Sequence, residues 1–129
     1  MGEPSQETNR LSHDVIGAAI EVHRTLGPGF LESAYELALV AELASRAIPF
    51  ARQVTVDLAY KGTAIGQVRL DLLVGGLLIV ELKAVEAILP IHLAQLRSYV
   101  KAVGAELGLI INFNTLRLAE GVKRVLPGS

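Results

Sequence analysis

Three charged side chains stand inside two otherwise apolar stretches of the chain. Asp71 lies within residues 68–74, and Glu81 and Lys83 lie within residues 77–83. Residues two apart on a β-strand point to the same face, so Glu81 and Lys83 share a face. Pairing of the two stretches as a hairpin would bring Asp71 alongside them. Charges among apolar residues are paired or bind a metal, because burying them alone is too costly. Two carboxylates and a lysine at one spot suit the hydrolysis of phosphodiesters with a divalent metal.

The metal that fits such a site is Mg²⁺ or Mn²⁺, which prefer carboxylate, carbonyl and water oxygens in octahedral geometry. Asp71 and Glu81 can supply two of these ligands, and the backbone carbonyl of Leu82 can supply a third. Lys83 would then stabilise negative charge on a scissile phosphate or help to deprotonate a metal-bound water. The spacing leaves a second interpretation open, in which Lys83 only forms an internal salt bridge with Glu81 or Asp71.

Two helices are predicted ahead of these strands. Residues 1–10 are polar and are expected to be flexible. From Ser12, which can cap a helix, apolar residues recur at helical spacing until a Gly-Pro-Gly stop at residues 27–29. A second helix is predicted over residues 31–46.

Three strands are predicted next, because the apolar pattern changes to a period of two. Their expected ranges are residues 53–60, 64–74 and 77–84. The turns between them are Lys61-Gly62 and Gly75-Gly76, and the second is a strong hairpin signal.

The rest of the chain predicts one more helix and two more strands. The helix follows Pro90 and spans residues 91–102, and the short apolar run over residues 107–113 is typical of a strand buried on both faces. A final edge strand is predicted over residues 116–126. The order ααβββαββ indicates a single α/β domain over residues 11–126, with a mixed sheet and at least one parallel pairing.

Composition limits the possible partners. The chain has 129 residues, a net charge of −1 and a hydrophobic fraction of 51%. Basic side chains outnumber acidic ones only after residue 45, so any nucleic-acid footprint is local and lies in the C-terminal two-thirds. The high aliphatic content leaves apolar surface for a partner, and we expect a homo-oligomer.

The location predicted for the protein is the cytoplasm. Cysteine is absent, which fits a reducing compartment. The polar N-terminus lacks the apolar region of a secretory signal. No window reaches the roughly 20 apolar residues that a membrane-spanning helix needs, so a membrane is not an expected partner.

Two further polar residues lie on the predicted helices. Glu32 is in the first turn of the second helix, where the helix dipole favours a carboxylate, and that benefit alone would explain it. Glu32 and Tyr35 share a helical face. Gln95 lies on the helix after the Glu81 strand, and taken alone it would be a solvated helix residue.

These pieces together resemble the GxxExxY family, a set of small bacterial proteins assigned to the PD-(D/E)xK nuclease-like superfamily. The name-giving motif is present as Gly29, Glu32 and Tyr35, and the resemblance covers residues 11–126. One departure is Leu70, which precedes Asp71 where the superfamily name has a proline. The other matching blocks, in the same order along the chain, are residues 69–74, 80–84, 92–99 and 109–113.

The resemblance implies a mixed sheet flanked by helices, with Asp71, Glu81 and Lys83 as the signature triad. It also implies that Glu32 is an additional acidic residue, contributed by the first core helix and able to help hold the metal. Gln95 would be the active-site glutamine that orients the phosphate or the water.

Other chemistry is not indicated. Residues 27–29 are not a phosphate-binding loop, since no Gly-Lys-Ser/Thr follows them. His13, His23 and His92 lie on predicted helices without metal-ligand spacing. For His23 and His92 we expect a packing or capping role.

Two functions follow from the sequence. The first is a metal-dependent nuclease that hydrolyses phosphodiester bonds with a Mg²⁺-activated water. The alternative is a non-catalytic nuclease-fold protein that acts as a binding or self-assembling module. The near-neutral charge and the aliphatic composition favour the alternative. The retained triad weighs against it, because unneeded buried charges are a burden to stability.

Overall fold

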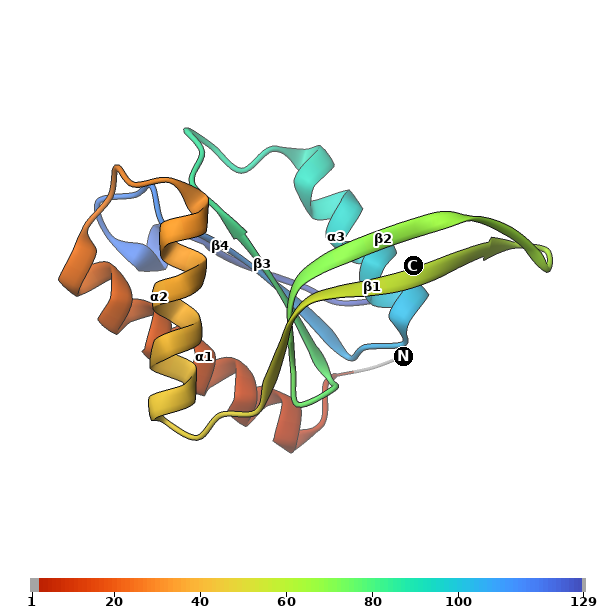
Figure 1. Cartoon of the computed structure of the whole chain (residues 1–129), viewed down its shortest axis with the longest axis horizontal. Helices are drawn as coiled ribbons and strands as arrows, with labels where there is room; N and C mark the ends of the chain where they lie inside the picture. The colour runs from red at the N-terminus through yellow and green to blue at the C-terminus, as the bar shows by residue number, and fades with distance from the viewer. Residues whose placement is uncertain (1–2, 129) are drawn as a thin grey trace.

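The structure is a computed structural model that describes residues 3–128. A five-stranded sheet forms its centre, with α1 and α2 packed on one face and α3 on the other (Figure 1). The helices are α1 (Gln6–Leu26), α2 (Glu32–Ser45), α3 (Pro90–Val103) and the short 3₁₀ helix η1 (Leu118–Gly121). The strands are β1 (Phe50–Tyr60), β2 (Thr63–Val74), β3 (Leu78–Lys83), β4 (Leu107–Asn112) and β5 (Val122–Val125). None of these helices is long and apolar enough to cross a membrane.

The strands lie in the sheet in chain order, from β1 at one edge to β5 at the other. All neighbours pair antiparallel except β3 and β4, which pair parallel and are connected by α3 as a crossover helix. The predicted order ααβββαββ and the mixed sheet are confirmed. The hairpin turn is also confirmed: Gly75 and Gly76 both have positive φ, of 59° and 71°, which matches the twist of the flanking strands.

Alternation along β3 divides the core into two layers. Val80 and Leu82 pack under α1 and α2, and Ile79 packs under α3. Glu81 and Lys83 have the same phase as Ile79, so they lie on the face of the sheet that α3 covers.

The beginning of the first helix corrects a prediction. The helix α1 already begins at Gln6, so a flexible segment over residues 1–10 is wrong from Gln6 onward, and residues 1–2 lie outside the described part of the chain. Ser5, not Ser12, is the N-cap, and its side chain accepts a hydrogen bond from the Thr8 backbone at 3.2 Å. The Thr8 hydroxyl in turn donates to Glu106 at 2.8 Å. This tertiary contact orders a segment whose polar composition alone suggested disorder.

The last strand is shorter than predicted. Residues 118–121 form η1, and pairing with β4 begins only at Val122. A Cβ atom on Gly121 would lie 2.2 Å from the Asn112 carbonyl oxygen, so the chain passes too close to β4 there for a regular strand. The predicted edge position of β5 is correct.

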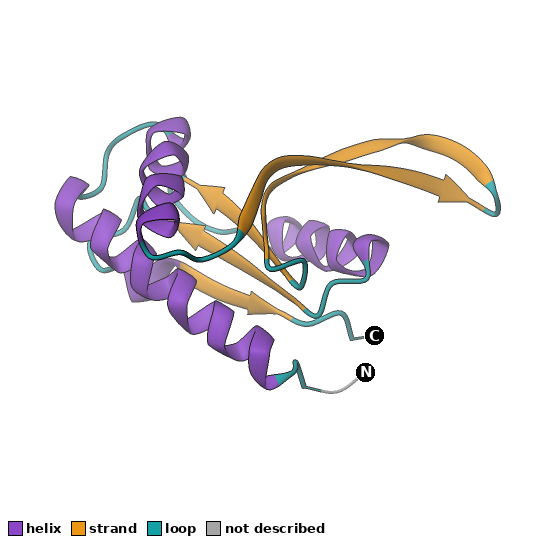
Figure 2. Ribbon diagram, turned by 60° about the horizontal axis from the view of Figure 1, so that its bottom comes forward, coloured by secondary structure: helices purple, strands orange, loops and turns teal. Residues whose placement is uncertain are grey.

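The hairpin of β1 and β2 extends well beyond the body of the domain (Figure 2). We call residues 55–68, its distal part, the arm. The arm ends in the predicted turn, where Lys61 and Gly62 have positive φ of 49° and 85°. At its root the strand β2 carries Asp71, so the hairpin helps to position the site.

Candidate active site

The site forms where β2 and β3 stop pairing. Their last backbone pair is Leu72 with Val80, and beyond it two carboxylates take over the free backbone donors. The Leu82 N–H donates to Oδ2 of Asp71 at 2.8 Å, and the Asp71 N–H donates to Oε2 of Glu81 at 3.1 Å. The predicted meeting of Asp71 and Glu81 is thus present, in an opening between two strands.

The side of the hairpin that packs on the core changes at this opening. Its pairing skips Gln53 and Asp71, and Gln53 has a positive φ of 52°. Leu72 packs in the core layer under α1 and α2, whereas Leu70, two residues away on the same strand, packs under α3. Asp71 therefore sits at the point where the apolar face of β2 changes sides, and its side chain is left at the opening.

Lys83 is the last residue of β3 and is partly buried. Within residues 3–128 it forms no salt bridge shorter than 4.0 Å, so the interpretation of Lys83 as an internal salt-bridge partner is wrong. Its charge still acts on the site, because it partly offsets the burial that raises the pKa values of Glu32, Asp71 and Glu81. The ammonium group of Lys83 is therefore near the carboxylates but forms no salt bridge with them.

Burial raises the pKa values of both carboxylates. Burial, followed by the charge of Asp71, raises the pKa of Glu81 to about 7. Burial also raises the pKa of Asp71, although the Leu82 N–H opposes this. A bound divalent cation would relieve both effects, since an opposite charge favours ionised carboxylates.

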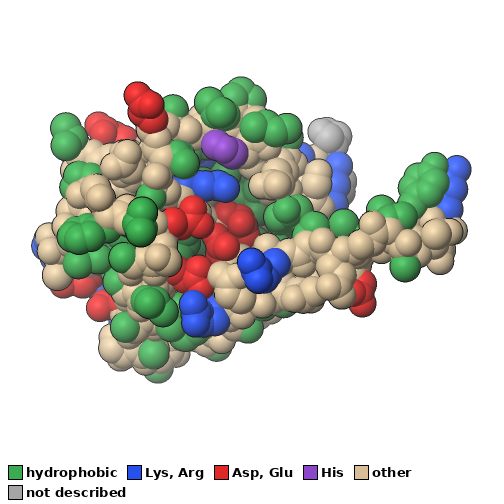
Figure 3. Space-filling view, turned by 45° about the horizontal axis from the view of Figure 1, so that its top comes forward, with side chains coloured by type: hydrophobic (Ala, Val, Ile, Leu, Met, Phe, Trp, Pro, Cys, Tyr) green, Lys and Arg blue, Asp and Glu red, His purple; other side chains and the backbone are tan. Residues whose placement is uncertain are grey.

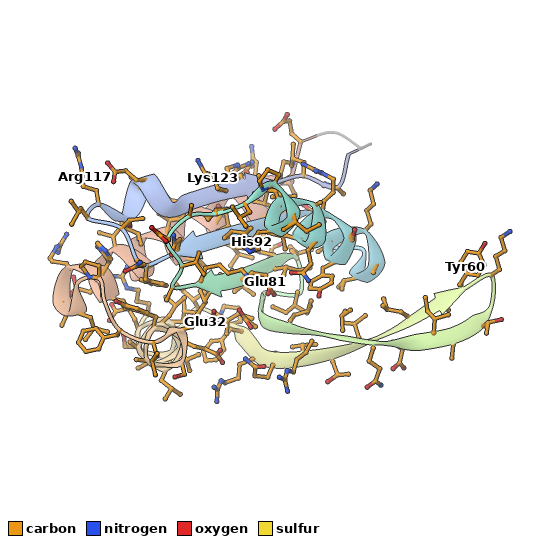
Figure 4. All side chains as sticks on the ribbon, turned by 90° about the horizontal axis from the view of Figure 1, so that it is seen from above. Glu32, Tyr60, Glu81, His92, Arg117 and Lys123 are labelled. Atoms are coloured by element: carbon orange, nitrogen blue, oxygen red, sulfur yellow. The ribbon has the colours of Figure 1, made fainter. Side chains whose placement is uncertain are left out.

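Glu32 is the first residue of α2 and is exposed at the rim of the site. Burial and the negative charge of Asp71 raise its pKa. Glu32 and Glu81 both lie at the root of the hairpin, whereas Tyr60 lies at the far tip of the arm (Figure 4). In the space-filling view, acidic side chains gather in a hollow at this root, with Lys or Arg side chains beside them (Figure 3).

The model of the PD-(D/E)XK nuclease superfamily matches residues 9–125. The chain belongs to this superfamily. A search of curated proteins and a search of solved structures each found no match. The narrower resemblance to GxxExxY proteins stays a prediction from the sequence blocks described above.

In this PD-(D/E)XK domain, the motif tyrosine has a structural role. Tyr35 is fully buried and stacks on Phe113, with ring centroids 4.6 Å apart. Its hydroxyl donates to the Gly27 carbonyl and accepts from the Phe30 N–H at 3.2 Å. These bonds fix the loop that leads into α2, and therefore the position of Glu32.

The donor set of the domain fits a hard cation but is small. No three His, Cys, Asp or Glu side chains of residues 3–128 meet closely enough to hold a metal ion. Glu32 therefore does not complete a three-carboxylate group with Asp71 and Glu81, and its role as a metal ligand stays a prediction. The two adjacent carboxylates and the Leu82 carbonyl are oxygen ligands of the type that Mg²⁺ and Mn²⁺ prefer, and they would hold such an ion.

Gln95 stays a prediction as well. It lies on the exposed side of α3, and no hydrogen bond joins its side chain to another residue of the described chain. Tyr99, one helical turn further on, is within reach of the charges of the two carboxylates. Burial, followed by the charges of Glu81 and Asp71, raises the pKa of Tyr99. Figure 4 places α3 beside the strand that carries Glu81.

Sequence reasoning missed three residues next to the triad, namely Glu36, Arg52 and Gln53. Glu36 is only 6% exposed, and its carboxylate accepts hydrogen bonds from Arg52 at 2.8 Å and from the Gln53 amide at 2.9 Å. One signal was available, since Glu36 follows Glu32 by one helical turn and both therefore face the same way.

The expected capping and packing roles of two histidines are confirmed. Nδ1 of His92 accepts a hydrogen bond from the Leu89 N–H at 2.9 Å and caps α3. His23 is buried, and its Nε2 lies 2.8 Å from the Thr115 carbonyl oxygen.

Proposed function

We propose that the protein hydrolyses phosphodiester bonds of nucleic acid with the help of Mg²⁺ or Mn²⁺. The observation that carries the proposal is the pair of carboxylates at the strand opening. Asp71 and Glu81 are held by backbone N–H groups, and Lys83, on the same strand as Glu81, has no salt-bridge partner within the described chain. Membership of the nuclease superfamily supports the same chemistry.

Asp71, Glu81 and the Leu82 carbonyl would hold the metal. A bound divalent ion lowers the pKa of water towards neutrality and so supplies a nucleophile at physiological pH. Lys83 would stabilise the negative charge that develops on the phosphate, a contribution typically worth about 3 kcal/mol. Glu32 would add negative charge at the rim, and Gln95 would orient the phosphate or the attacking water.

The test is cleavage of labelled single-stranded DNA, duplex DNA, branched DNA and RNA with Mg²⁺ or Mn²⁺. Lys83→Ala should fold normally by circular dichroism and lose cleavage by at least about 100-fold. Lys123→Ala, on the opposite edge strand, is the matched control and should cleave like the wild type. Undiminished cleavage by Lys83→Ala would exclude this mechanism.

A second function, self-assembly or binding without catalysis, is favoured by the arm. Tyr60 and Ile65 are 61% and 59% exposed there, and a two-stranded hairpin is only marginally stable on its own. Size-exclusion chromatography with light scattering tests the assembly part of this proposal, because a strict monomer at all concentrations contradicts it. A protein that cleaves no substrate and binds no Mn²⁺ would favour this second function over the nuclease.

A further inference from the structure

We infer that Gln53 is a positioning residue for Asp71, and that the buried carboxylate of Glu36 holds Gln53 in place. The inference rests on the proposed function for its purpose, since a metal ligand must be held in one orientation before the metal binds. Its evidence comes from three contacts that meet at the strand opening.

The first contact anchors Glu36. Its side chain is almost completely buried on α2, where an unpaired carboxylate would be very unfavourable. Arg52 compensates its charge through Nη2 at 2.8 Å and Nε at 3.2 Å. This pair joins α2 to the root of the hairpin by two charge-assisted hydrogen bonds, which fix the direction of the contact as well as its distance.

The second contact orients the amide of Gln53. Its Nε2 donates to the Glu36 carboxylate at 2.9 Å. The backbone of Gln53 has a φ of 52°, a conformation that suits glycine and that other residues keep only where their surroundings determine it. The side chain is therefore directed inwards at the one position of β1 that lies opposite Asp71.

The third contact reaches Asp71. Gln53 is the residue of β1 that stands opposite Asp71 in the hairpin, and its amide partly offsets the rise in the pKa of Asp71 that burial causes. On the other side of the opening, the Leu82 N–H donates to Oδ2 at 2.8 Å. Asp71 is thus held from both β1 and β3, and the partners of a metal ligand typically change metal affinity by 10–100-fold when they are removed.

The experiment compares Gln53→Gly with Gln67→Gly. Glycine accepts the positive φ at position 53, so this variant removes the amide without new backbone strain. Gln67 lies on the same hairpin and also donates its amide to a carboxylate, that of Asp57 at 2.6 Å, but away from the site. The Mn²⁺ affinity of the folded proteins is measured by the paramagnetic resonance signal of free Mn²⁺. Gln53→Gly should bind Mn²⁺ at least about tenfold more weakly than the wild type, and Gln67→Gly should match the wild type.

A second measurement needs no metal. Hydrogen exchange of the Leu82 amide, followed by NMR, reports how firmly the Asp71 carboxylate is held, and the Ile110 amide of β4 serves as the internal reference. Exchange at Leu82 should become faster in Gln53→Gly while exchange at Ile110 stays unchanged. A role in general stability would accelerate both amides.

The outcomes separate the inference from the proposed function. If the wild type binds Mn²⁺ and Gln53→Gly binds it equally well, the inference is overturned. If the wild type binds no Mn²⁺, the proposed function fails, and the Leu82 exchange rate decides alone. An unchanged rate in Gln53→Gly then overturns the inference, and a selectively faster rate supports it.

Discussion

The backbone amide of Asp71 donates a hydrogen bond to the carboxylate of Glu81 at 3.1 Å, across the opening where β2 and β3 stop pairing. A carboxylate occupies the place that a backbone carbonyl would have in a continuous ladder. The two acidic residues are consequently held close together without a metal, and burial, followed by the charge of Asp71, raises the pKa of Glu81.

The stability of the metal-free protein should fall as the pH rises from about 4.5 to about 7. Glu81 has a pKa of about 7 in the folded protein and an ordinary value of 4.5. In this window the folded state keeps a proton that the unfolded state has lost, so its stabilising contribution is full below pH 4.5 and is lost as the pH passes 7. The loss is about 3 kcal/mol, the equivalent of this pKa shift. Urea unfolding at pH 5 and pH 8 measures it.

Glu81→Gln isolates this contribution, because the amide cannot ionise. Its free energy of unfolding should change less between pH 5 and pH 8 than that of the wild type. Glu86→Gln, at an exposed position on the loop after β3, should keep the wild-type slope. Equal slopes for Glu81→Gln and the wild type would contradict the assignment of the raised pKa to Glu81.

Binding of Mn²⁺ near pH 6.5 should release up to about one proton, since carboxylate ligands must ionise to coordinate a metal. Glu81 is mostly protonated at this pH and is the group expected to release it. Isothermal titration calorimetry in two buffers of different ionisation enthalpy gives the number of protons. The number should fall towards zero at pH 8.5, and a release that does not depend on pH would argue against Glu81 as a ligand.

The alternation of residues and the Gly75-Gly76 turn were sufficient to predict the strands, their pairing and the meeting of Asp71 with Glu81, because these features depend on local periodicity. The strand opening was not predictable in the same way. It depends on a positive φ at Gln53, where a glycine would have been the usual signal. The burial of Glu36 depends on Arg52, which lies 16 residues further along the chain.

The first helix shows the same limit. Its capping residue Ser5 and its first-turn residue Thr8 both bond Glu106, about 100 residues away in the chain. A contact between residues so far apart in the chain leaves no signal in the local sequence pattern. The polar composition of the segment therefore predicted flexibility. The triad was accessible because unusual residue types in apolar strands are visible in the sequence, whereas the groups that hold the triad are ordinary polar residues whose role arises only from the fold.

The hydroxyl of Tyr35 should matter more for the site than for the core. Tyr35→Phe keeps the ring that stacks on Phe113 but removes the donor to the Gly27 carbonyl and the acceptor for the Phe30 N–H. The expected cost is about 1–2 kcal/mol in the free energy of unfolding, the value of losing a buried hydrogen bond. Urea unfolding checks this cost.

The same substitution tests whether the loop positions Glu32, because a loosened loop no longer fixes the first residue of α2. Cleavage should fall further in Tyr35→Phe than in Tyr60→Phe, which removes an exposed hydroxyl at the tip of the arm. Fluorine NMR of a probe attached at position 33, after Ser33→Cys, should show a broader signal in the Tyr35→Phe background than in the Tyr60→Phe background. A probe signal of equal width in the two backgrounds would mean that the hydroxyl stabilises the fold without ordering the start of α2, and that Glu32 is positioned by the helix itself.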